Sequence, residues 1–253
     1  MKEKTVNLCG LVEREEIKSF SIYTKPSSGR FSEHEFLEFR HPLRTQNRKI
    51  NEYNLMKELY NKKINERSIF KYFLGLLSRI RLYLKYGLIR MYARIRGAYI
   101  GRNSIITWKL ACRANKNLVI GNDCIVESWN IDLRSKVEIC DNVIINRDVV
   151  IIRVSHYIDN DKSFTTRFYP DLKIEMYCWL CTGCIILPSV NTIAEGSVVG
   201  AYSVLTKSTI PMGVYAGNPA ILKRLHNTNF EDLVVSSLMG GDLFYYVKAK
   251  NLN

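Results

Sequence analysis

The sequence predicts a mainly β protein built on a left-handed parallel β-helix. Two observations predict this fold: an aliphatic residue recurs every six residues, and a small residue recurs at the fifth place of each block. Between residues 174 and 207 an aliphatic residue opens each block of six, with one extra residue at Asn191 or Thr192. The fifth place of each block is small. Six residues form one flat side of a triangular coil, in which the aliphatic residue fills the interior and the small residue lets the corner close. The aliphatic places are Ile174, Leu180, Ile186, Ile193, Val199 and Leu205, and the small places are Cys178, Cys184, Val190, Ser197, Ser203 and Thr209.

The same period extends the coil toward the N-terminus, so we expect a β-helix domain over residues 99–210. Matching blocks begin at Ile100, Ile120, Val126, Ile139, Ile145 and Ile151, and the phase is lost between Trp108 and Asn117. The regularity also breaks over residues 157–173, a polar and aromatic stretch without a period. A long loop that leaves a regular scaffold is usually functional, so this segment is predicted to be an excursion loop.

The two ends of the chain differ from the coil. Residues 1–50 mix charge with Ser, Gly and Pro and show no period, which predicts a polar, poorly ordered extension. Residues 51–98 have a helical pattern. Residues 211–253 leave the coil through Pro211 and a GNP turn, and are predicted to form an exit segment and a short helical cap over the open end of the coil.

The helical region is basic and amphipathic. Its predicted apolar face consists of Ile69, Phe73, Leu76, Leu77, Ile80, Tyr83, Leu84, Leu88 and Met91. Residues 1–98 carry a net charge of +11 (21 basic minus 10 acidic residues), whereas residues 99–253 carry +2 (16 minus 14). Charges recur too often for a membrane span.

Two interpretations of residues 69–96 remain open. A basic amphipathic helix can lie in the surface of an anionic bilayer. The alternative is that the apolar face packs on the coil or on a neighbouring subunit. No nucleic-acid recognition module accompanies the charge, so binding of nucleic acid is not expected.

The chain has seven cysteines, of which Cys178, Cys181 and Cys184 have the spacing C-x2-C-x2-C. This spacing can indicate a zinc or iron–sulfur site. However, Cys178 and Cys184 occupy small places of the repeat, where a thiol packs as a small hydrophobe. We therefore expect no metal site, and free thiols without a signal peptide predict a cytoplasmic protein.

His156 is the candidate catalytic residue. Of the four histidines, at positions 34, 41, 156 and 226, it alone ends a regular block of the coil, directly before the excursion loop. A histidine there projects from the rim of a rigid scaffold, and imidazole can take a proton from a hydroxyl near neutral pH.

Residues 151–207, followed by VYAGNPAILKR at 214–224, resemble the hexapeptide-repeat O-acetyltransferases, in particular the branch that modifies exopolysaccharide and capsule sugars in colanic acid biosynthesis. RIRGAYIG at 94–101 and NLVIGN at 117–122 are similar to the same branch, so the resemblance covers about residues 94–225. The GNPA exit in phase with the repeat is its most specific feature.

The resemblance implies a cytoplasmic homotrimer that binds acetyl-CoA as co-substrate in the cleft between neighbouring coils and acetylates a saccharide acceptor. On this mapping His156 is the general base, and the backbone N–H of Thr182 faces the developing oxyanion. The implied cofactor-binding residues are Trp179 and Ala201 along the pantetheine arm, Thr206, Lys207 and Arg224 near the adenosine end, where positive charge suits phosphate, and Pro219 at the adenine pocket.

Three positions depart from the family pattern. Cys181 and Ser189 stand where the family has glycine, and the added residue at 191–192 interrupts the repeat. A side chain at Cys181 could crowd the thioester arm. This leaves a second hypothesis, that the coil is catalytically inactive and acts as a membrane-surface or protein-binding module.

Overall fold

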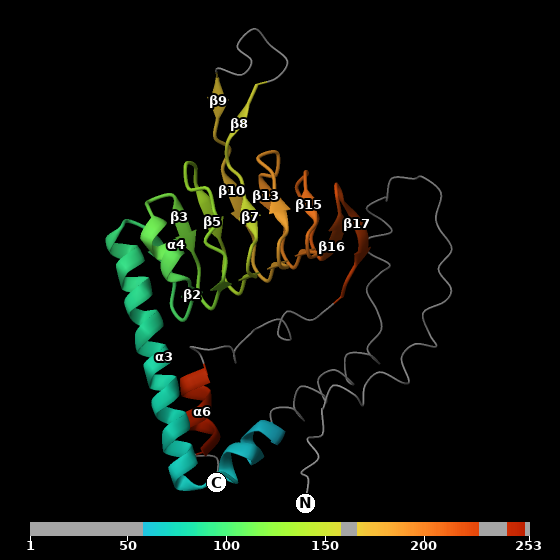
Figure 1. Ribbon diagram of the computed structural model, residues 1–253. Coiled ribbons are helices and arrows are strands. Elements are labelled where there is room, and N and C mark those ends of the chain that lie inside the picture. Colours follow the sequence, from blue (N-terminus) through green and yellow to red (C-terminus); the bar gives the residue numbers. More distant parts are fainter. Residues whose placement is uncertain (1–57, 158–165, 228–241, 251–253) are drawn as a thin grey trace, which may run out of the picture. The chain divides into compact units, whose positions relative to one another are not determined.

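The computed structural model describes residues 58–157, 166–227 and 242–250, and its main feature is a parallel β-solenoid (Figure 1). Sheet A contains β1 (Tyr99–Ile100), β3 (Leu118–Ile120), β5 (Val137–Ile139), β10 (Leu172–Ile174) and β13 (Thr192–Ile193). Sheet B contains β2 (Ile105–Ile106), β4 (Ile125–Val126), β6 (Ile144–Ile145), β11 (Trp179–Leu180), β14 (Val198–Val199), β16 (Gly213–Gly217) and β17 (Ala220–Leu225). Sheet C contains β7 (Val150–Ile151), β12 (Ile185–Ile186) and β15 (Val204–Leu205).

The parallel register places equivalent residues of the repeat directly above one another. In sheet A, Ile100 pairs with Ile120, Ile120 with Ile139, Ile139 with Ile174, and Ile174 with Ile193. These five side chains are at most 1% exposed. A column of branched aliphatic side chains fills the interior of the coil, as the period of six predicted.

The small places of the repeat lie inside the corners. Ser197 and Thr209 share a hydrogen bond of 2.8 Å between their hydroxyl groups, and both are buried. Burial raises the pKa of the Cys178 and Cys184 thiols to about 12, so both stay protonated at neutral pH. Cys181, by contrast, is half-buried. In the described part of the chain, no group of three or more His, Cys, Asp or Glu side chains is arranged to hold a metal ion.

A short helix occupies the stretch where the repeat loses its phase. Helix α4 (Trp108–Arg113) begins at Thr107, whose hydroxyl accepts a hydrogen bond of 3.1 Å from the Leu110 N–H. Helix α3 (Ile69–Ile95) contacts α4, β1 and β2, and the rings of Tyr92 and Trp108 stack with centroids 4.8 Å apart. The two helices therefore cover the first turns of the coil.

The helix over the basic region is confirmed, but most of its predicted apolar face does not pack on the coil. Helix α3 contacts the coil through a different side, on which Ile89 and Ala93 are buried. Leu77, Leu84 and Leu88 of the predicted apolar face are 58–61% exposed. The small Ala93 side chain allows a close approach to the coil that the longer leucines on the other side would prevent.

The C-terminal helix α6 (Asp242–Lys250) packs on α3, although we expected the C-terminal segment to cover the open end of the coil. Tyr246 is fully buried, stacks on Tyr72 at 5.0 Å and lies 3.9 Å from the Arg79 guanidinium. At the other end of sheet B, β16 and β17 form an antiparallel hairpin. The predicted extension (1–50) and most of the segment between the coil and α6 lie outside the described residues. No helix among the described residues could cross a membrane.

The excursion loop leaves the coil as a two-stranded arm, seen above sheet A in Figure 1. Strand β8 (Ser155–His156) pairs antiparallel with β9 (Arg167–Phe168), and the Tyr157 and Phe168 rings lie 4.9 Å apart. The coil resumes at β10, so Leu172 and Lys173 belong to the coil and not to the loop. Residues 158–165 of the predicted loop lie outside the described part.

Arg153 lies at the base of this arm with its side chain fully buried. Its guanidinium donates to the carbonyl oxygens of Pro170 (2.9 Å), Asp171 (3.2 Å), Leu187 (3.3 Å), Pro188 (3.1 Å) and Val190 (3.0 Å). Burial lowers the pKa of Arg153, and the carboxylates of Asp132 and Asp171 oppose this shift. A guanidinium remains charged in proteins. The side chain therefore ties both stems of the arm to the next turn of the coil.

The buried column makes a testable prediction. Replacing Ile174 with Ala removes a fully buried side chain from the middle of sheet A and should lower the free energy of unfolding by about 3 kcal/mol. Lys173→Ala, one residue earlier on the exposed side of the same strand, should change it by less than about 0.5 kcal/mol. Urea denaturation measures both, and equal effects would contradict the assignment of the interior.

The buried guanidinium makes a second prediction. Arg153→Lys cannot reproduce the planar fork and leaves buried carbonyl groups without donors, so it should destabilise the protein by about 3 kcal/mol. The matched control is Arg134→Lys, because Arg134 is exposed and forms its ion pair with Asp132 at 2.7 Å. If both variants unfold at the urea concentration of the original protein, Arg153 does not hold the base of the arm.

Candidate active site

Sheet C separates two edges of the coil that carry the predicted site residues. The B–C edge is formed by the turns that lead from sheet B into sheet C, and contains Thr182 and Ala201. The C–A edge is formed by the turns that leave sheet C, and contains His156, Thr206 and Lys207. One side of the coil, about six extended residues, is on the order of 20 Å wide. One chain therefore does not bring the two groups together.

Successive turns stack at the B–C edge. The Thr182 carbonyl accepts a hydrogen bond of 3.0 Å from the Tyr202 N–H, and the Gly183 N–H donates to the Arg147 carbonyl at 3.1 Å. The Thr182 N–H itself donates to no group in the described part of the chain. It is therefore available to a ligand oxygen.

Trp179 precedes this edge on β11. Its ring points away from the interior, because the next residue, Leu180, is the fully buried one. The side chain is 45% exposed. A large, half-exposed aromatic side chain beside an edge of the coil can contact an apolar ligand group or another chain.

The C–A edge carries His156 on β8, directly opposite Arg167 of β9. The His156 side chain is half-buried and lies outside the interior column of the coil. Arg153, three residues earlier, anchors the base of the arm to the coil. The start of the strand that carries His156 is therefore held in place. Below the arm, the Ser189 hydroxyl donates to the Thr206 carbonyl at 2.7 Å, and Lys207 is exposed.

The last two predicted residues lie on the exit hairpin. Pro219 is in the turn between β16 and β17, and Arg224 on β17 lies opposite Val214. Both side chains are exposed. Nearby, His226 makes a 2.6 Å hydrogen bond from its ring Nε2 to the Gly196 carbonyl, which gives this histidine a structural role.

The outer surfaces of the three sheets differ in polarity. On sheet A the outward row is mixed and consists of Tyr99, Val119, Glu138, Lys173 and Thr192. On sheet B it consists of Ile105, Ile125, Ile144, Trp179, Val198 and Val214, and on sheet C of Val150, Ile185 and Val204. Sheets B and C thus have apolar outer rows on both sides of the B–C edge, a pattern suited to contact with another chain.

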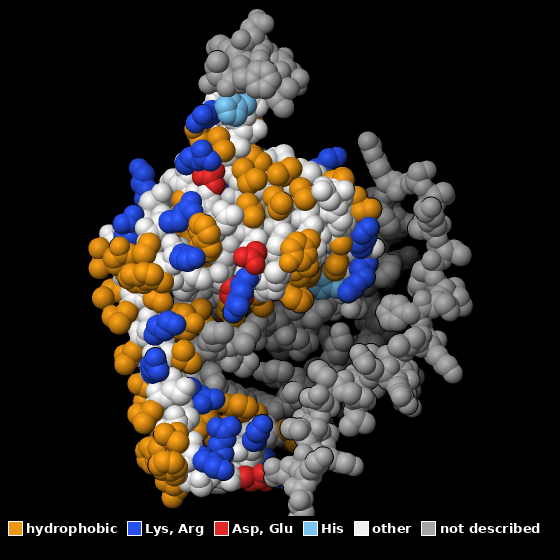
Figure 2. All heavy atoms as spheres, viewed as in Figure 1, with side chains coloured by type: hydrophobic (Ala, Val, Ile, Leu, Met, Phe, Trp, Pro, Cys, Tyr) orange, Lys and Arg blue, Asp and Glu red, His pale blue; other side chains and the backbone are white. Residues whose placement is uncertain are grey.

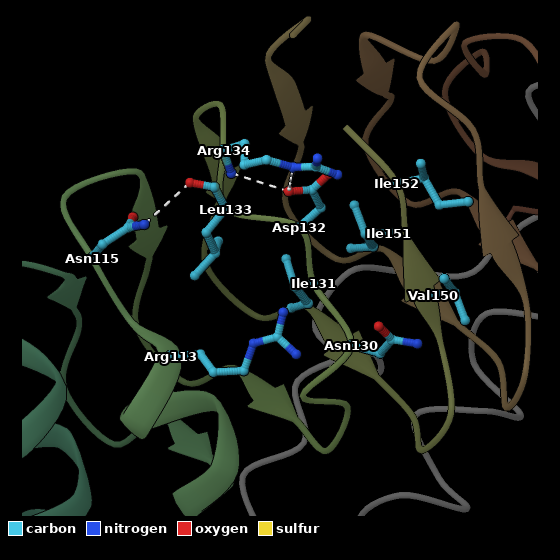
Figure 3. Close-up of a pocket in the computed structure, with 10 residues that line it drawn as sticks. All are labelled: Arg113, Asn115, Asn130, Ile131, Asp132, Leu133, Arg134, Val150, Ile151 and Ile152. Carbon is cyan, nitrogen blue, oxygen red and sulfur yellow. Dashed lines mark hydrogen bonds and ion pairs between the residues drawn. The ribbon is translucent and has the colours of Figure 1, made fainter. Parts of the chain in front are cut away.

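A hollow of about 470 Å³ lies between α4 and β7 (Figure 3). Its polar lining includes Arg113, Asn115, Asn130, Asp132 and Arg134, and its apolar lining includes Ile131, Leu133, Val150, Ile151 and Ile152. None of the predicted site residues lines it. The sequence contained no signal for this hollow, because it forms where the repeat is irregular and where α4 folds back beside the coil.

Some of its polar groups are already paired. The Arg134 guanidinium hydrogen-bonds both carboxylate oxygens of Asp132, at 2.8 and 2.7 Å, and so lowers the pKa of that carboxyl group. The Asn115 side-chain amide donates to the Leu133 carbonyl at 3.2 Å. Arg113 lies 5.3 Å from the ring of Trp129, which is 40% exposed. The hollow thus combines amide and guanidinium groups with an exposed indole next to it.

Comparison with known proteins relates the chain to acetyltransferases, although no protein-family model matches it. A protein of Schizosaccharomyces pombe named as an acetyltransferase is 34% identical over 85 residues, which span 33% of this chain and 41% of that protein. The colanic acid biosynthesis acetyltransferase WcaF of Escherichia coli is 30% identical over 132 residues, which span 52% of this chain and 71% of the relative.

Solved structures are also similar to the chain, at lower identity. A hexapeptide-repeat acetyltransferase from Vibrio cholerae, solved with acetyl coenzyme A, is 19% identical over 71% of this chain and 90% of its own, with a TM-score of 0.42. A galactoside acetyltransferase in complex with coenzyme A is 19% identical over 70% of this chain and 82% of its own, with a TM-score of 0.40. At these values the likeness concerns the fold alone.

The sequence relationship to the Escherichia coli protein extends over most of that protein, and the solenoid agrees with the repeat that predicted it. The chain is therefore a member of the hexapeptide-repeat acetyltransferase family to which the colanic acid biosynthesis acetyltransferase WcaF belongs.

Proposed function

We propose that the protein is an O-acetyltransferase that moves the acetyl group of acetyl-CoA to a hydroxyl group of a saccharide, such as an exopolysaccharide or capsule precursor. The observation that carries this proposal is the position of His156, half-buried on an arm at the edge of an acetyltransferase coil. The name of the Escherichia coli relative, which refers to colanic acid, favours a saccharide acceptor. The free cysteines and the CoA donor favour a cytoplasmic location.

In the proposed reaction His156 acts as general base. The imidazole takes the proton of the acceptor hydroxyl while the hydroxyl oxygen attacks the thioester carbonyl carbon. The oxyanion of the tetrahedral intermediate accepts a hydrogen bond from the Thr182 N–H, which has no acceptor among the described residues. When the C–S bond breaks, the acetyl ester forms and the CoA sulfur receives the proton from the imidazolium.

This reaction requires two copies of the chain, because His156 and Thr182 lie on opposite sides of sheet C. We propose that the C–A edge of one coil meets the B–C edge of its neighbour and that three coils close a ring. The apolar outer rows of sheets B and C support such an association. Each of the three sites would then contain residues from two subunits.

Acetyl-CoA would lie along the groove between the two edges. Trp179 and Ala201 would contact the pantetheine arm, and Trp179 has the exposed apolar surface that this requires. Lys207 and Arg224 would neutralise the phosphates, with Thr206 beside them. Both cations are exposed, and neither has an ion-pair partner in the described part of the chain. Pro219, exposed in the turn of the hairpin, would border the adenine.

The acceptor would use the hollow beside β7. Amide and guanidinium groups from Asn130 and Arg113 can bond saccharide hydroxyls, and the indole of Trp129 offers a flat surface for a sugar ring. Ile152 lines the hollow and comes four residues before His156. An acceptor bound there would therefore contact the segment that connects β7 to the proposed base.

The first test of this proposal concerns His156. His156→Ala should lower the rate of acetyl transfer about a thousandfold, because it removes general-base catalysis, and should leave the affinity for CoA within about twofold. Release of CoA is measured against a panel of nucleotide sugars and oligosaccharides. His226→Gln serves as the control, since the His226 ring bonds to the backbone carbonyl of Gly196 and thus has a structural role. Transfer by His156→Ala at the original rate would refute the assignment.

The second test concerns the donor. CoA at about a hundred times its dissociation constant should stabilise the folded protein by about 2.7 kcal/mol and raise the midpoint of thermal unfolding. Lys207→Ala combined with Arg224→Ala should reduce this shift, whereas Lys173→Ala on sheet A should not. If millimolar CoA produces no shift, the coil is better explained as an inactive binding module.

A further inference from the structure

Helix α3 carries a continuous apolar stripe on its outer side. The stripe consists of Ile69, Phe70, Phe73, Leu74, Leu77, Ile80, Leu84, Leu88, Met91 and Ile95, which are between 37% and 75% exposed. Figure 2 shows hydrophobic side chains gathered along the length of this helix. Successive members are mostly three or four residues apart, so they share one helical face. An exposed apolar surface of this extent marks an interaction site.

The stripe is not the face by which α3 packs within the chain. Ile89 and Ala93 face the coil and are buried, and Tyr72 contacts Tyr246 of α6. Neither side chain at the coil contact belongs to the stripe. The described residues that surround α3 therefore leave the stripe open along the whole helix of 27 residues, which is roughly 40 Å long.

The charges beside the stripe are all positive. Helix α3 contains no Asp or Glu, and Lys71, Arg81 and Lys85 are exposed. Arg81 follows Leu77 by four residues and precedes Leu84 by three, which places it at the border of the stripe. Long basic side chains at the border of an apolar face can extend to phosphate groups while the apolar side chains insert below them.

A second copy of the stripe is a poorer partner than an anionic lipid. Two α3 helices in contact would bring their basic borders together without an acidic residue on either helix. Two acidic groups on the outside of sheet A already have basic partners, since Glu138 pairs with Lys136 at 2.6 Å and Glu175 with Lys173 at 3.8 Å. An anionic bilayer offers both the apolar layer and the negative charge.

We propose that α3 lies in the surface of an anionic membrane, with the stripe in the acyl region and Arg81 and Lys85 at the lipid phosphates. This interaction would hold the coil beside the bilayer. It is independent of the chemistry assigned to His156, so acetyl transfer to a soluble acceptor should continue when it is lost.

Sedimentation with vesicles tests the membrane proposal. The full chain should sediment with vesicles of phosphatidylglycerol mixed with phosphatidylcholine, and much less with phosphatidylcholine alone or in high salt. Leu77→Gln combined with Leu84→Gln should weaken binding about a hundredfold, because two exposed apolar side chains no longer insert. Arg81→Gln combined with Lys85→Gln should weaken it about thirtyfold.

The matched control is Met176→Gln combined with Ile210→Gln, which removes two apolar side chains of 41% and 42% exposure from the coil and should leave vesicle binding unchanged. Sedimentation velocity on the same proteins reports the assembly state. If the chain does not bind anionic vesicles, or if Leu77→Gln with Leu84→Gln binds them normally, the proposal is wrong. If that variant instead breaks an assembly into smaller species while vesicles bind neither protein, a second copy covers the stripe.

Discussion

The structure depends on one constraint, the stacking of equivalent places of the repeat in parallel register. Because Ile139 lies between Ile120 and Ile174 in the same column, each turn buries the side chain of the turn before it. A single turn has no interior of its own, so stability comes from contacts between neighbouring turns. The same stacking fixes the edges, where a residue of one turn lies directly above its equivalent in the next. Predicted site residues that are far apart in the sequence therefore line up along the B–C and C–A edges.

The arm is the main interruption of this stacking near the proposed base. Inserting a segment between β7 and β10 separates two turns that must still pair, since β5 and β10 are direct neighbours in sheet A. Arg153 bridges this interruption with bonds to carbonyl groups on both the returning stem and the next turn. The cation needs no carboxylate in contact, because several carbonyl dipoles replace its hydration. At the base of the inserted segment, the chain thus places a fully buried arginine whose guanidinium donates five hydrogen bonds to carbonyl groups.

The sequence alone predicted the coil, most of its inward residues and the helix over the basic region, because each follows from a short period. It did not predict α4, which fills a stretch without a period, or the role of Arg153, which no residue pattern distinguishes from an exposed arginine. For α3 the period identified the apolar face but did not show whether this face is turned toward the coil. An apolar stripe predicts a contact but does not identify the surface that it contacts. The hollow beside β7 could not be predicted, because it arises from the packing of α4 against irregular turns. His156 was placed at an edge correctly, but its separation from Thr182 by the width of sheet C depends on the order of strands around the coil.

The distribution of charge relates the proposed site to helix α3. On sheet A, acidic and basic side chains pair with one another, so this surface has little net charge to direct the molecule. Helix α3, by contrast, has exposed positive charge beside apolar side chains, and it lies at the opposite end of sheet B from the exit hairpin. Lys207 and Arg224, which we assign to the donor, lie near that exit end. Anionic groups of two kinds, a lipid surface and a nucleotide phosphate, would therefore bind at different ends of the coil. A chain built in this way can hold a membrane surface and a soluble donor at the same time, because neither anion competes for the cations of the other.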